Sequence, residues 1–504
     1  MKILALRDLA AVLDRLRAEG KRIVHCHGVF DVLHVGHIRY FEEARAMGDV
    51  LVVTLTRDAY VNKGPHRPAF SEALRAEVIA ALGVVDYVAV NTWPTAAETI
   101  RLLRPHVYVK GPDYVDAAKD VTGGIALEDE AVRSVGGALR FTEGVMFSSS
   151  QLVNQHIPLF APDVNAWLER FRGRHTAAEV KWHLENLRSM KVLVVGEAIL
   201  DEYVYCDALG KSAKEPLLAL RFLTSETHAG GSLAIVNHLA GFCESVDLVT
   251  YLGTVNPRDE FLQDSLKPNV RPFVVRKSGS PTIVKRRFVD KYSVSKLLEV
   301  YEINDEPLSA AEEDELCRAL EERVAECDVA IVADFGHGLL TARARELMSN
   351  KARYLAVNTQ INAANHGFHT ISKYRRADYV CVQEGEIRLD SRDRSGDLNA
   401  MIVDVAKRLA CDSVMITRGK HGTLLYRERE GFFACPSFAI RVVDRLGAGD
   451  AVLAITSLCA ARQVPADVVG FIANIVGAQV VTIVGNSASV DRVGILKSVE
   501  SLLK

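Results

Sequence analysis

The sequence predicts an α/β chain with two successive domains, each built around a parallel sheet covered by helices. Short apolar segments alternate with segments of helical spacing in the first part of the chain, and the same alternation restarts at Lys191. The chain of 504 residues is also too long for one core, at about 150 residues per domain. We therefore predict a first domain over residues 1–156, a helical linker over 157–190 and a second domain over 191–504.

Composition narrows the classes of function. Hydrophobic residues make up 49% of the chain and the formal net charge is −3, so we expect neither a nucleic-acid partner nor a membrane partner. The nine cysteines include no C-x-x-C pair, which predicts reduced thiols and no metal site. Charged residues interrupt the first 20 positions, and no later apolar run could span a bilayer. These features predict a cytoplasmic protein.

The first domain alternates strands and helices in order along the chain. Such alternation predicts a parallel sheet with the ligand at the carboxyl ends of its strands. The predicted strands cover residues 22–27, 50–56, 84–90 and 107–109, and the predicted helices cover 38–45, 70–82, 95–103 and 127–134.

The segment Gly28-Val-Phe-Asp-Val-Leu-His-Val-Gly-His37 turns a strand into a helix. His34 and His37 would share one face of the first helical turn, where free N–H groups favour phosphate. A plain capping or core role for the two histidines is the alternative. The segment resembles the signature of the nucleotidyltransferase family that includes glycerol-phosphate cytidylyltransferases and the transferase half of bifunctional heptose-phosphate enzymes. The resemblance implies a Rossmann-like domain in which Gly28, Phe30, Asp31 and Gly36 bind the nucleotide.

Three further segments resemble the same family. Lys63 follows the second strand and is similar to the family lysine that reaches the triphosphate, while Arg75, in a helix start, would bind the acceptor. For Arg75, a solvated surface charge is the alternative. Lys110-Gly-Pro-Asp113-Tyr resembles the family segment Lys-Gly-Gly-Asp-Tyr, with Pro112 in place of the second glycine.

A serine run closes the first domain. Ser148, Ser149 and Ser150 resemble the late Ser-Thr-Thr motif that meets phosphate at a helix start, although an ordinary N-cap is the alternative. Together these segments imply attack by an acceptor phosphate on the α-phosphorus of CTP or ATP, with release of pyrophosphate. His34, His37 and Lys63 would stabilise the reacting charge, and Mg²⁺ would bind through the nucleotide phosphates.

The second domain opens on a buried strand that leads to Gly196, Glu197 and Asp201. This opening resembles the ribokinase-like (PfkB) sugar kinases, whose first acidic residues bind substrate hydroxyls. The resemblance implies a ribokinase-like α/β domain in which Glu197, Asp201 and three later residues bind substrate. Those three are Gly230, Gly231 and Asp334.

The segments expected to bind the nucleotide in the second domain follow one another along the chain in the order typical of the ribokinase-like kinases. Small residues in Gly447-Ala448-Gly449 would expose N–H groups at a helix N-terminus, and Asp450 would take a proton from the attacking hydroxyl. A helix start with an acidic first turn is the alternative. The resemblance further implies nucleotide contacts by Glu386, Thr417 and Gly419.

Several positions depart from the kinase pattern. Ala234 stands where many relatives have asparagine, His337 replaces a lysine, and Gln383 replaces the asparagine of Asn-x-x-Glu. We therefore expect a kinase with an altered substrate, and a catalytically silent scaffold is the alternative. The segment Lys285-Arg286-Arg287 could clamp a substrate phosphate, but an exposed strand edge is the commoner arrangement.

The resemblances together imply a bifunctional enzyme of nucleotide-activated sugar or polyol synthesis. The second domain would phosphorylate a sugar or sugar phosphate with ATP, and the first would couple a sugar or polyol phosphate to a nucleotide. An active transferase that carries a silent kinase-like dimerisation or effector-binding domain is the alternative. The ribokinase-like resemblance also implies a homodimer.

Overall fold

A computed structural model describes residues 2–61, 67–112, 124–142, 160–293, 295–363 and 365–504. The chain divides into two compact units, Met1–Asn165 with Leu496–Lys504 and Ala166–Ile495. The predicted domain boundaries at residues 156 and 190 stay a prediction. None of the helices in the described part of the chain combines the length and apolar character needed to cross a bilayer.

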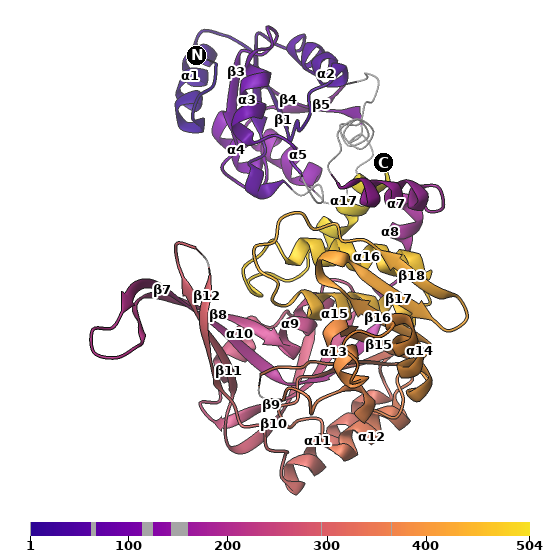
Figure 1. Cartoon of the computed structure of the whole chain (residues 1–504). Helices are drawn as coiled ribbons and strands as arrows, with labels where there is room; N and C mark the ends of the chain where they lie inside the picture. Colours follow the sequence, from indigo (N-terminus) through magenta and orange to yellow (C-terminus); the bar gives the residue numbers. More distant parts are fainter. Residues whose placement is uncertain (1, 62–66, 113–123, 143–159, 294, 364) are drawn as a thin grey trace. The chain divides into compact units, whose positions relative to one another are not determined.

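The first unit is built on a five-stranded parallel sheet with the order β3-β2-β1-β4-β5 (Figure 1). Because β1 lies between β2 and β4, the strand order reverses beside β1, and ligands of such sheets bind at the carboxyl ends of these strands. The strands are β1 (Ile23–Gly28), β2 (Val50–Leu55), β3 (Tyr87–Val90), β4 (Val107–Lys110) and β5 (Ala138–Phe141). The helices are α1 (Leu6–Ala18), α2 (Val35–Arg45), α3 (Glu72–Ala80), α4 (Ala97–Leu103) and α5 (Gly124–Ser134), with a 3-10 turn η1 (Asp58–Tyr60).

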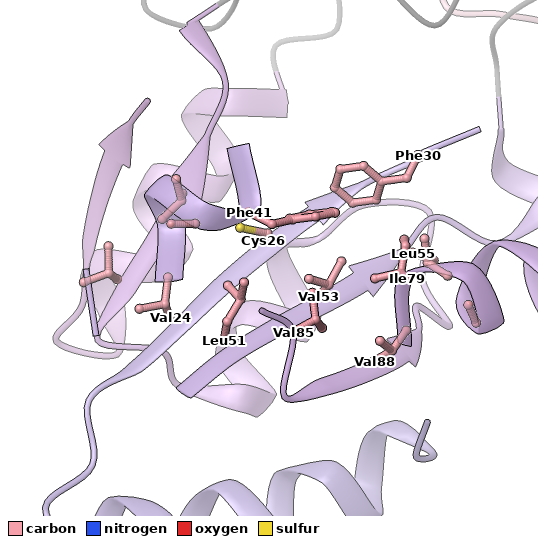
Figure 2. Close-up of a cluster of buried hydrophobic side chains, with 14 residues drawn as sticks. Val24, Cys26, Phe30, Phe41, Leu51, Val53, Leu55, Ile79, Val85 and Val88 are labelled. Atoms are coloured by element: carbon pink, nitrogen blue, oxygen red, sulfur yellow. The ribbon is translucent and has the colours of Figure 1, made fainter. Parts of the chain in front are cut away.

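Alternate residues of β1 enter two different cores. Val24 and Cys26 pack with Phe41 of α2 and Ile79 of α3 on one face (Figure 2). Ile23 belongs to a second cluster with residues of α1. This strand-period alternation in a sheet buried on both faces confirms the predicted α/β class for the first domain.

The second unit is built on a nine-stranded sheet with the order β10-β9-β6-β13-β14-β15-β16-β17-β18. Its strands are parallel from β10 to β16, and β17 and β18 are antiparallel. The strands are β6 (Lys191–Gly196), β9 (Ser245–Val255), β10 (Val270–Pro281), β13 (Val329–Asp334), β14 (Leu355–Thr359), β15 (Tyr379–Gln383), β16 (Ser413–Thr417), β17 (Thr423–Arg427) and β18 (Gly431–Cys435).

Helices precede, connect and follow these strands, as the predicted α/β class requires. The helices that lie wholly within Ala166–Ile495 are α8 (Ala177–Glu185), α9 (Ser232–Leu239), α10 (Asp259–Ser265), α11 (Ala310–Val324), α12 (Ala342–Lys351), α13 (Glu384–Asp390), α14 (Leu398–Arg408), α15 (Ala448–Ala461) and α16 (Ala466–Val480). Helix α7 (Pro162–Arg172) begins before Ala166, and helix α17 (Arg492–Leu503) ends after Ile495. Two 3-10 turns, η4 (Ile371–Lys373) and η5 (Gly419–His421), complete the unit.

A second sheet of four strands, which we call the small sheet, follows β6 directly. Its order is β12-β11-β7-β8, with β7 (Ala198–Lys211), β8 (Leu218–Gly231), β11 (Ile283–Asp290) and β12 (Lys296–Glu302). The register sets His228, Asp201 and Lys285 side by side across β8, β7 and β11. Residues paired in this way point to the same face of a sheet, so the small sheet carries one row of ionisable side chains.

Candidate active sites

Two histidines lie at the start of α2, directly after the carboxyl end of β1. His34 caps the helix, because its Nδ1 accepts a hydrogen bond from the N–H of Gly36 at 3.1 Å. The rings of His34 and His37 stack with their centroids 3.9 Å apart. The structure therefore brings the two predicted catalytic histidines together, at a helix N-terminus suited to an anion.

The turn between β1 and α2 depends on a close approach of Phe30 to Gly28. Phe30 has a left-handed backbone with φ +48°, and its buried ring meets the ring of His37 edge-on at 5.4 Å. A Cβ on Gly28 would lie only 2.9 Å from the Phe30 ring. In Figure 2, Phe30 lies beside Phe41 at one end of the core cluster. Gly28 thus makes room for the ring that supports His37.

The carboxylate of Asp31 is buried and is hydrogen-bonded within the first domain. Its carboxylate accepts hydrogen bonds from Arg67 Nη1 at 2.6 Å and from the N–H of Ala69 at 2.6 Å. Side chains of Asp31 and Arg67 are buried at 0% and 2% exposure. The structure therefore assigns Asp31 to holding the segment that enters α3, and direct nucleotide contact stays a prediction.

Arg75 of α3 is also internal, unlike a solvated surface charge. It donates hydrogen bonds to the carbonyls of Phe70 (3.0 Å), Val29 and Thr56 (2.9 Å), and it pairs with Asp58 at 2.5 Å. Val29 and Thr56 directly follow β1 and β2. Arg75 consequently holds two strand ends together, and acceptor binding by Arg75 stays a prediction.

Lys110 ends β4, next to β1 in the sheet. Its ammonium lies 2.8 Å from Glu128 of α5, and both side chains are about nine-tenths buried. The same ammonium lies 5.5 Å from the ring centre of Tyr108. A nucleotide phosphate that bound Lys110 would compete with Glu128 for it.

Sequence reasoning missed a buried polar network beneath this site. His25 and His27 lie two positions apart on β1, so their side chains share one face of the strand. Each ring is hydrogen-bonded to Thr54 Oγ1 of β2, at 2.7 Å for His25 and 2.9 Å for His27. Burial, together with the charge of Lys110, lowers the pKa of His25 to about 3 and that of His27 well below its usual value. Both imidazoles are therefore neutral at pH 7. Their spacing of two in a predicted strand is the signal that could have indicated a shared face.

Five predicted residues of the first domain lie outside the described residues. They are Lys63, Asp113, Ser148, Ser149 and Ser150. Their roles stay predictions.

In the second unit, Asp450 lies in the first turn of α15 behind a tight glycine turn. Gly447 has φ +76°, and a Cβ there would meet Asn486 Oδ1 at 1.9 Å, so only glycine fits. The N–H groups in the first turn of α15, which include those of Ala448 and Gly449, have no partner within the helix. Burial, with a contribution from Asp201, raises the pKa of Asp450 to about 7.

Asp201 of the small sheet is paired across strands. Arg287 Nη1 lies 2.5 Å from one carboxylate oxygen, and Asn486 donates to the other at 3.3 Å. A Cβ on Gly230 would lie 2.1 Å from the same carboxylate, which explains the first glycine of the pair. Gly231 has φ +55°. Asn486, which no motif indicated, therefore joins Asp201 to the turn at Gly447.

Glu197 supports the loop after β13. Its carboxylate accepts hydrogen bonds from the N–H groups of Phe335 (3.0 Å), His337 (3.1 Å) and Leu339 (3.4 Å). Burial and nearby Asp334 raise the pKa of Glu197 to about 7 despite these bonds. Glu197 is thus turned toward the backbone, and substrate binding by it stays a prediction.

Asp334 is held by a cluster that the sequence did not indicate. Tyr374 donates to its carboxylate at 2.6 Å, and Lys373 Nζ lies 2.8 Å away. His369 Nε2 lies 3.4 Å from the other oxygen, and its Nδ1 contacts Lys373 at 2.7 Å. Because these partners already surround Asp334, its predicted role in substrate binding stays a prediction.

Glu386 lies in the first turn of α13, where it is the third helical residue of a capping box with Gln383. Its carboxylate accepts hydrogen bonds from the N–H of Gln383 at 2.7 Å and of Ile361 at 3.1 Å, and burial raises its pKa to about 7. Thr417 ends β16, and Gly419 follows with φ +55°. Nucleotide contacts by these three residues stay predictions.

The basic run on β11 separates into three environments. Arg286 pairs with Glu202 and Glu302, and Arg287 pairs with Asp201 and Glu299. Lys285 is buried, yet its ammonium forms no hydrogen bond or ion pair with any residue that the structure describes. Burial lowers the pKa of Lys285, and the charge of Lys285 partly offsets the rise in the pKa of Asp450 that burial causes. Lys285 is thus the member of this run that remains available to an anion.

Comparison with known families agrees with both domains. Residues 189–492 match the model of the pfkB family of carbohydrate kinases. The chain belongs to the pfkB family. Residues 25–154 match the cytidylyltransferase-like family, so the pfkB kinase domain follows a cytidylyltransferase-like domain in this chain. These two matches confirm the predicted combination of a cytidylyltransferase-like domain and a pfkB kinase domain.

The curated relatives of this pfkB-family chain are similar to its N-terminal part. Bifunctional protein HldE of Geobacter metallireducens is 43% identical over 141 residues, 27% of this chain and 29% of that protein. Bifunctional protein HldE of Aliarcobacter butzleri is 47% identical over 135 residues, 26% of this chain and 27% of that protein. The chain thus aligns with less than a third of each relative.

Solved structures of low identity show the fold of the pfkB domain. Phosphofructokinase-2 from Escherichia coli, solved in complex with potassium, superimposes with a TM-score of 0.51 at 13% identity. The match covers 62% of this chain and 100% of that chain. The predicted ribokinase-like α/β class of the second domain is confirmed.

Proposed function

We propose that the chain is a bifunctional enzyme that makes a nucleotide-activated sugar or polyol. Its pfkB domain would phosphorylate a sugar or sugar phosphate with ATP, and its cytidylyltransferase-like domain would join a sugar or polyol phosphate to a nucleotide. The observation that carries the kinase half is Asp450, a buried carboxylate at a helix N-terminus whose pKa of about 7 suits a general base.

In the kinase step, an acceptor hydroxyl attacks the γ-phosphorus of ATP. The new O–P bond forms as the bond from the γ-phosphorus to the bridging oxygen breaks, so ADP leaves, and Asp450 takes the hydroxyl proton. N–H groups at Gly447, Ala448 and Gly449 would stabilise the charge on the transferred group. Lys285, buried near Asp450, supplies a further positive charge to this site.

In the transferase step, a phosphate oxygen of the acceptor attacks the α-phosphorus of CTP or ATP. Pyrophosphate leaves as the α–β bridging bond breaks, and no covalent intermediate with the protein is needed. The stacked His34 and His37 would hold the charged oxygens at the start of α2, with Lys63 on the triphosphate.

Mg²⁺ would enter both reactions with the nucleotides. In the described part of the chain, no group of three His, Cys, Asp or Glu side chains could hold a metal ion. The ion would accompany the nucleotide substrate, bound through its phosphates, where it would neutralise phosphate charge.

The experiment that tests this proposal separates the two reactions. Purified chain is supplied with ATP or CTP and a panel of sugars, polyols and their phosphates, and both pyrophosphate and phosphorylated product are measured. Asp450→Asn should lose phosphorylation alone, and His37→Ala should lose pyrophosphate release alone.

A silent kinase domain is the second candidate function, favoured by the pairing of Asp201 with Arg287. It predicts pyrophosphate release without phosphorylation of any acceptor, and Asp450→Asn would then change nothing. Absence of both reactions would contradict the bifunctional proposal.

We further propose a homodimer that forms through the small sheet. The C-terminal end of β7 and the N-terminal end of β8 lie together at one end of this sheet. There the side chains of Leu209, Leu218 and Phe222 are 59%, 52% and 63% exposed. Exposed apolar side chains on a long edge strand favour pairing with a second copy. Since both reactions consume nucleoside triphosphates, we also propose that the chain acts in the cytoplasm.

A further inference from the structure

Glu128 of α5 is a buried carboxylate to which the proposed reactions assign no role. Its Oε2 lies 2.8 Å from the ammonium of Lys110, the last residue of β4. The side chains of Lys110 and Glu128 are 9% and 10% exposed. Lys110 is the one cation that pairs with Glu128 in the described part of the chain. A buried pair of this kind is costly to separate unless each charge gains another partner.

The pair lies where a ligand of this sheet is expected. β4 pairs with β1, and the strand order reverses at β1, so ligands bind at the carboxyl ends of these two strands. Burial, and then the charge of Lys110, lower the pKa of His25 and of His27 on β1. The ammonium therefore acts on the strand that leads to His34 and His37. Lys110 is a positive charge beside the predicted phosphate site, and Glu128 neutralises it.

Tyr108 offers Glu128 a second partner. Tyr108 lies two residues before Lys110 on β4, so both side chains point to the same face of the sheet. Its fully buried ring belongs to one cluster with Ala131 and Val132 of α5. Burial, and then the charge of Glu128, raise the pKa of Tyr108 well above its usual value. The hydroxyl thus keeps its proton and lies near the Glu128 carboxylate.

The Tyr108 hydroxyl has no hydrogen-bond partner among the described residues, although it is buried. A buried donor without an acceptor is costly, so it is expected to gain one in another state of the protein. Rotation of the Glu128 side chain from Lys110 toward Tyr108 would supply that acceptor. Lys110 would then pair with another anion in place of Glu128. The two pairings of Glu128 are discrete arrangements, as a local switch requires.

We propose that Glu128 is a positioning residue of the nucleotidyltransferase site and is exchanged on Lys110 for a phosphate group of a substrate. In the free chain, Glu128 neutralises Lys110. In the complex, a phosphate oxygen pairs with Lys110 and the Tyr108 hydroxyl donates to Glu128. Glu128 thereby competes with the phosphate and sets the affinity of the site. This inference rests on the proposed transferase function and adds to it a residue that controls substrate binding.

Glu128→Gln removes the competing charge at nearly constant volume. Calorimetry on the full chain with Mg²⁺ measures binding of CTP, of ATP, and of sugar and polyol phosphates added to the nucleotide-loaded chain. Binding that is lost in His37→Ala is assigned to the first domain. At least one of these compounds should bind there roughly 10-fold more tightly in Glu128→Gln. If none binds more tightly, the proposal is overturned.

Glu130→Gln is the matched control. Glu130 lies on the same helix and is exposed, so its substitution makes the same change of net charge without touching the buried pair. We expect the same affinities as in the unmodified chain. An equal tightening in Glu130→Gln would show that net charge alone controls binding, and it would overturn the role of Glu128.

Lys110→Met separates exchange from simple repulsion between Glu128 and the phosphate. If Glu128 acts by competing for Lys110, adding Glu128→Gln to Lys110→Met should not change the affinity further. Repulsion would act without Lys110, so a 10-fold tightening that persists in the double variant would overturn the exchange.

Tyr108→Phe tests the second partner and does not depend on whether Glu128→Gln folds. Because the hydroxyl has no partner in the described free chain, its loss should not lower the thermal midpoint. Binding should weaken about 5-fold, since Glu128 would leave Lys110 without gaining a donor. Unchanged affinity would overturn the exchange of partners.

The arms of the experiment also identify the phosphate. A response of CTP or ATP assigns the partner of Lys110 to the nucleotide, and a response confined to sugar or polyol phosphates assigns it to the acceptor. If these responses appear but pyrophosphate is never released, the exchange stands and the transferase proposal falls. If pyrophosphate is released with the same KM values in Glu128→Gln, the transferase stands and the exchange falls. If no compound binds in a manner that depends on His37, both fall.

Discussion

Asp450 links the burial of one carboxylate to the pH at which the proposed kinase works. Its pKa of about 7 results from burial, with Asp201 nearby and Lys285 acting in the opposite direction. A general base must be deprotonated before it accepts a proton. We therefore expect kcat/KM for phosphorylation to rise with pH and to level off above an apparent pKa of about 7. Initial rates between pH 5.5 and 9 would show this, and a flat profile would contradict it.

Asp450→Asn provides the matched variant for that profile. It should lower phosphorylation by roughly 10²–10⁴-fold, the range of general-base contributions. Because the raised pKa means that ionised Asp450 is disfavoured in the folded chain, its cost to stability grows as pH rises above its ordinary pKa of 3.8 and is fully present above about 7. Asp450→Asn should therefore be at least as stable as the unmodified chain at pH 8, as measured by thermal unfolding. A lower midpoint would show that the lost activity reflects misfolding.

Packing in the first domain requires glycine at position 28. A Cβ there would crowd the Phe30 ring at 2.9 Å, and that ring supports His37. Gly28→Ala should destabilise the first domain by about 1–3 kcal/mol, as overpacked cores do, and should reduce pyrophosphate release. Denaturant unfolding and the pyrophosphate assay check the two effects. Gly83→Ala is the control, because its Cβ would meet nothing within 4 Å.

At the scale of elements, side chains from two strands of the small sheet contact the carboxylate of Asp444, which lies just before α15 in the sequence. Asp444 accepts from Tyr203 of β7 (2.9 Å) and pairs with Lys296 of β12 (2.7 Å). It also accepts from the N–H of Leu446, just before the Gly447 turn, at 3.1 Å. Burial alone would raise the pKa of Asp444, but the hydrogen bonds and the Lys296 charge lower it overall.

Lys296→Met should therefore disturb phosphoryl transfer through Asp444. We expect kcat for phosphorylation to fall about 10-fold, with little change in acceptor affinity, because a buried carboxylate that has lost its one cationic partner among the described residues would shift the turn before α15. Lys296→Arg should keep most of the rate, and added ammonium or methylammonium ions should partly restore Lys296→Met. A variant whose rate is lost but never restored by a cation would argue for a purely structural role.

The same elements show what could be read from the sequence. Strand and helix periods predicted β1 to β4 of the first sheet and the turn from β1 into α2, because local spacing controls such features, but they missed the four-residue edge strand β5. The partners of Arg75 are backbone carbonyls of Val29 and Thr56, and no residue pattern marks a carbonyl as a partner. The pairing of Asp201 with Arg287 depends on strand register between segments 86 residues apart. Long-range register and backbone partners of this kind therefore required the structure.

At the scale of the whole molecule, the small sheet exposes large apolar side chains on β7 and β8. Phe222 is 63% exposed on the edge strand β8. If a second copy covers it, Phe222→Glu should convert the dimer to a monomer without loss of secondary structure. Light scattering after size exclusion would measure the mass, with Tyr292→Glu as the control, since Tyr292 is 99% exposed in the turn between β11 and β12. A monomeric unmodified chain would contradict the homodimer.

The neutral histidines of β1 supply a natural spectroscopic reporter. His25 Nε2 and Thr54 Oγ1 share a buried hydrogen bond of 2.7 Å, sealed from solvent. A labile proton confined in this way exchanges slowly, so it should give a sharp proton NMR line downfield of the amides. Titrating CTP or ATP while observing that line would show which nucleotide reaches the neighbouring strand ends, without any label or turnover.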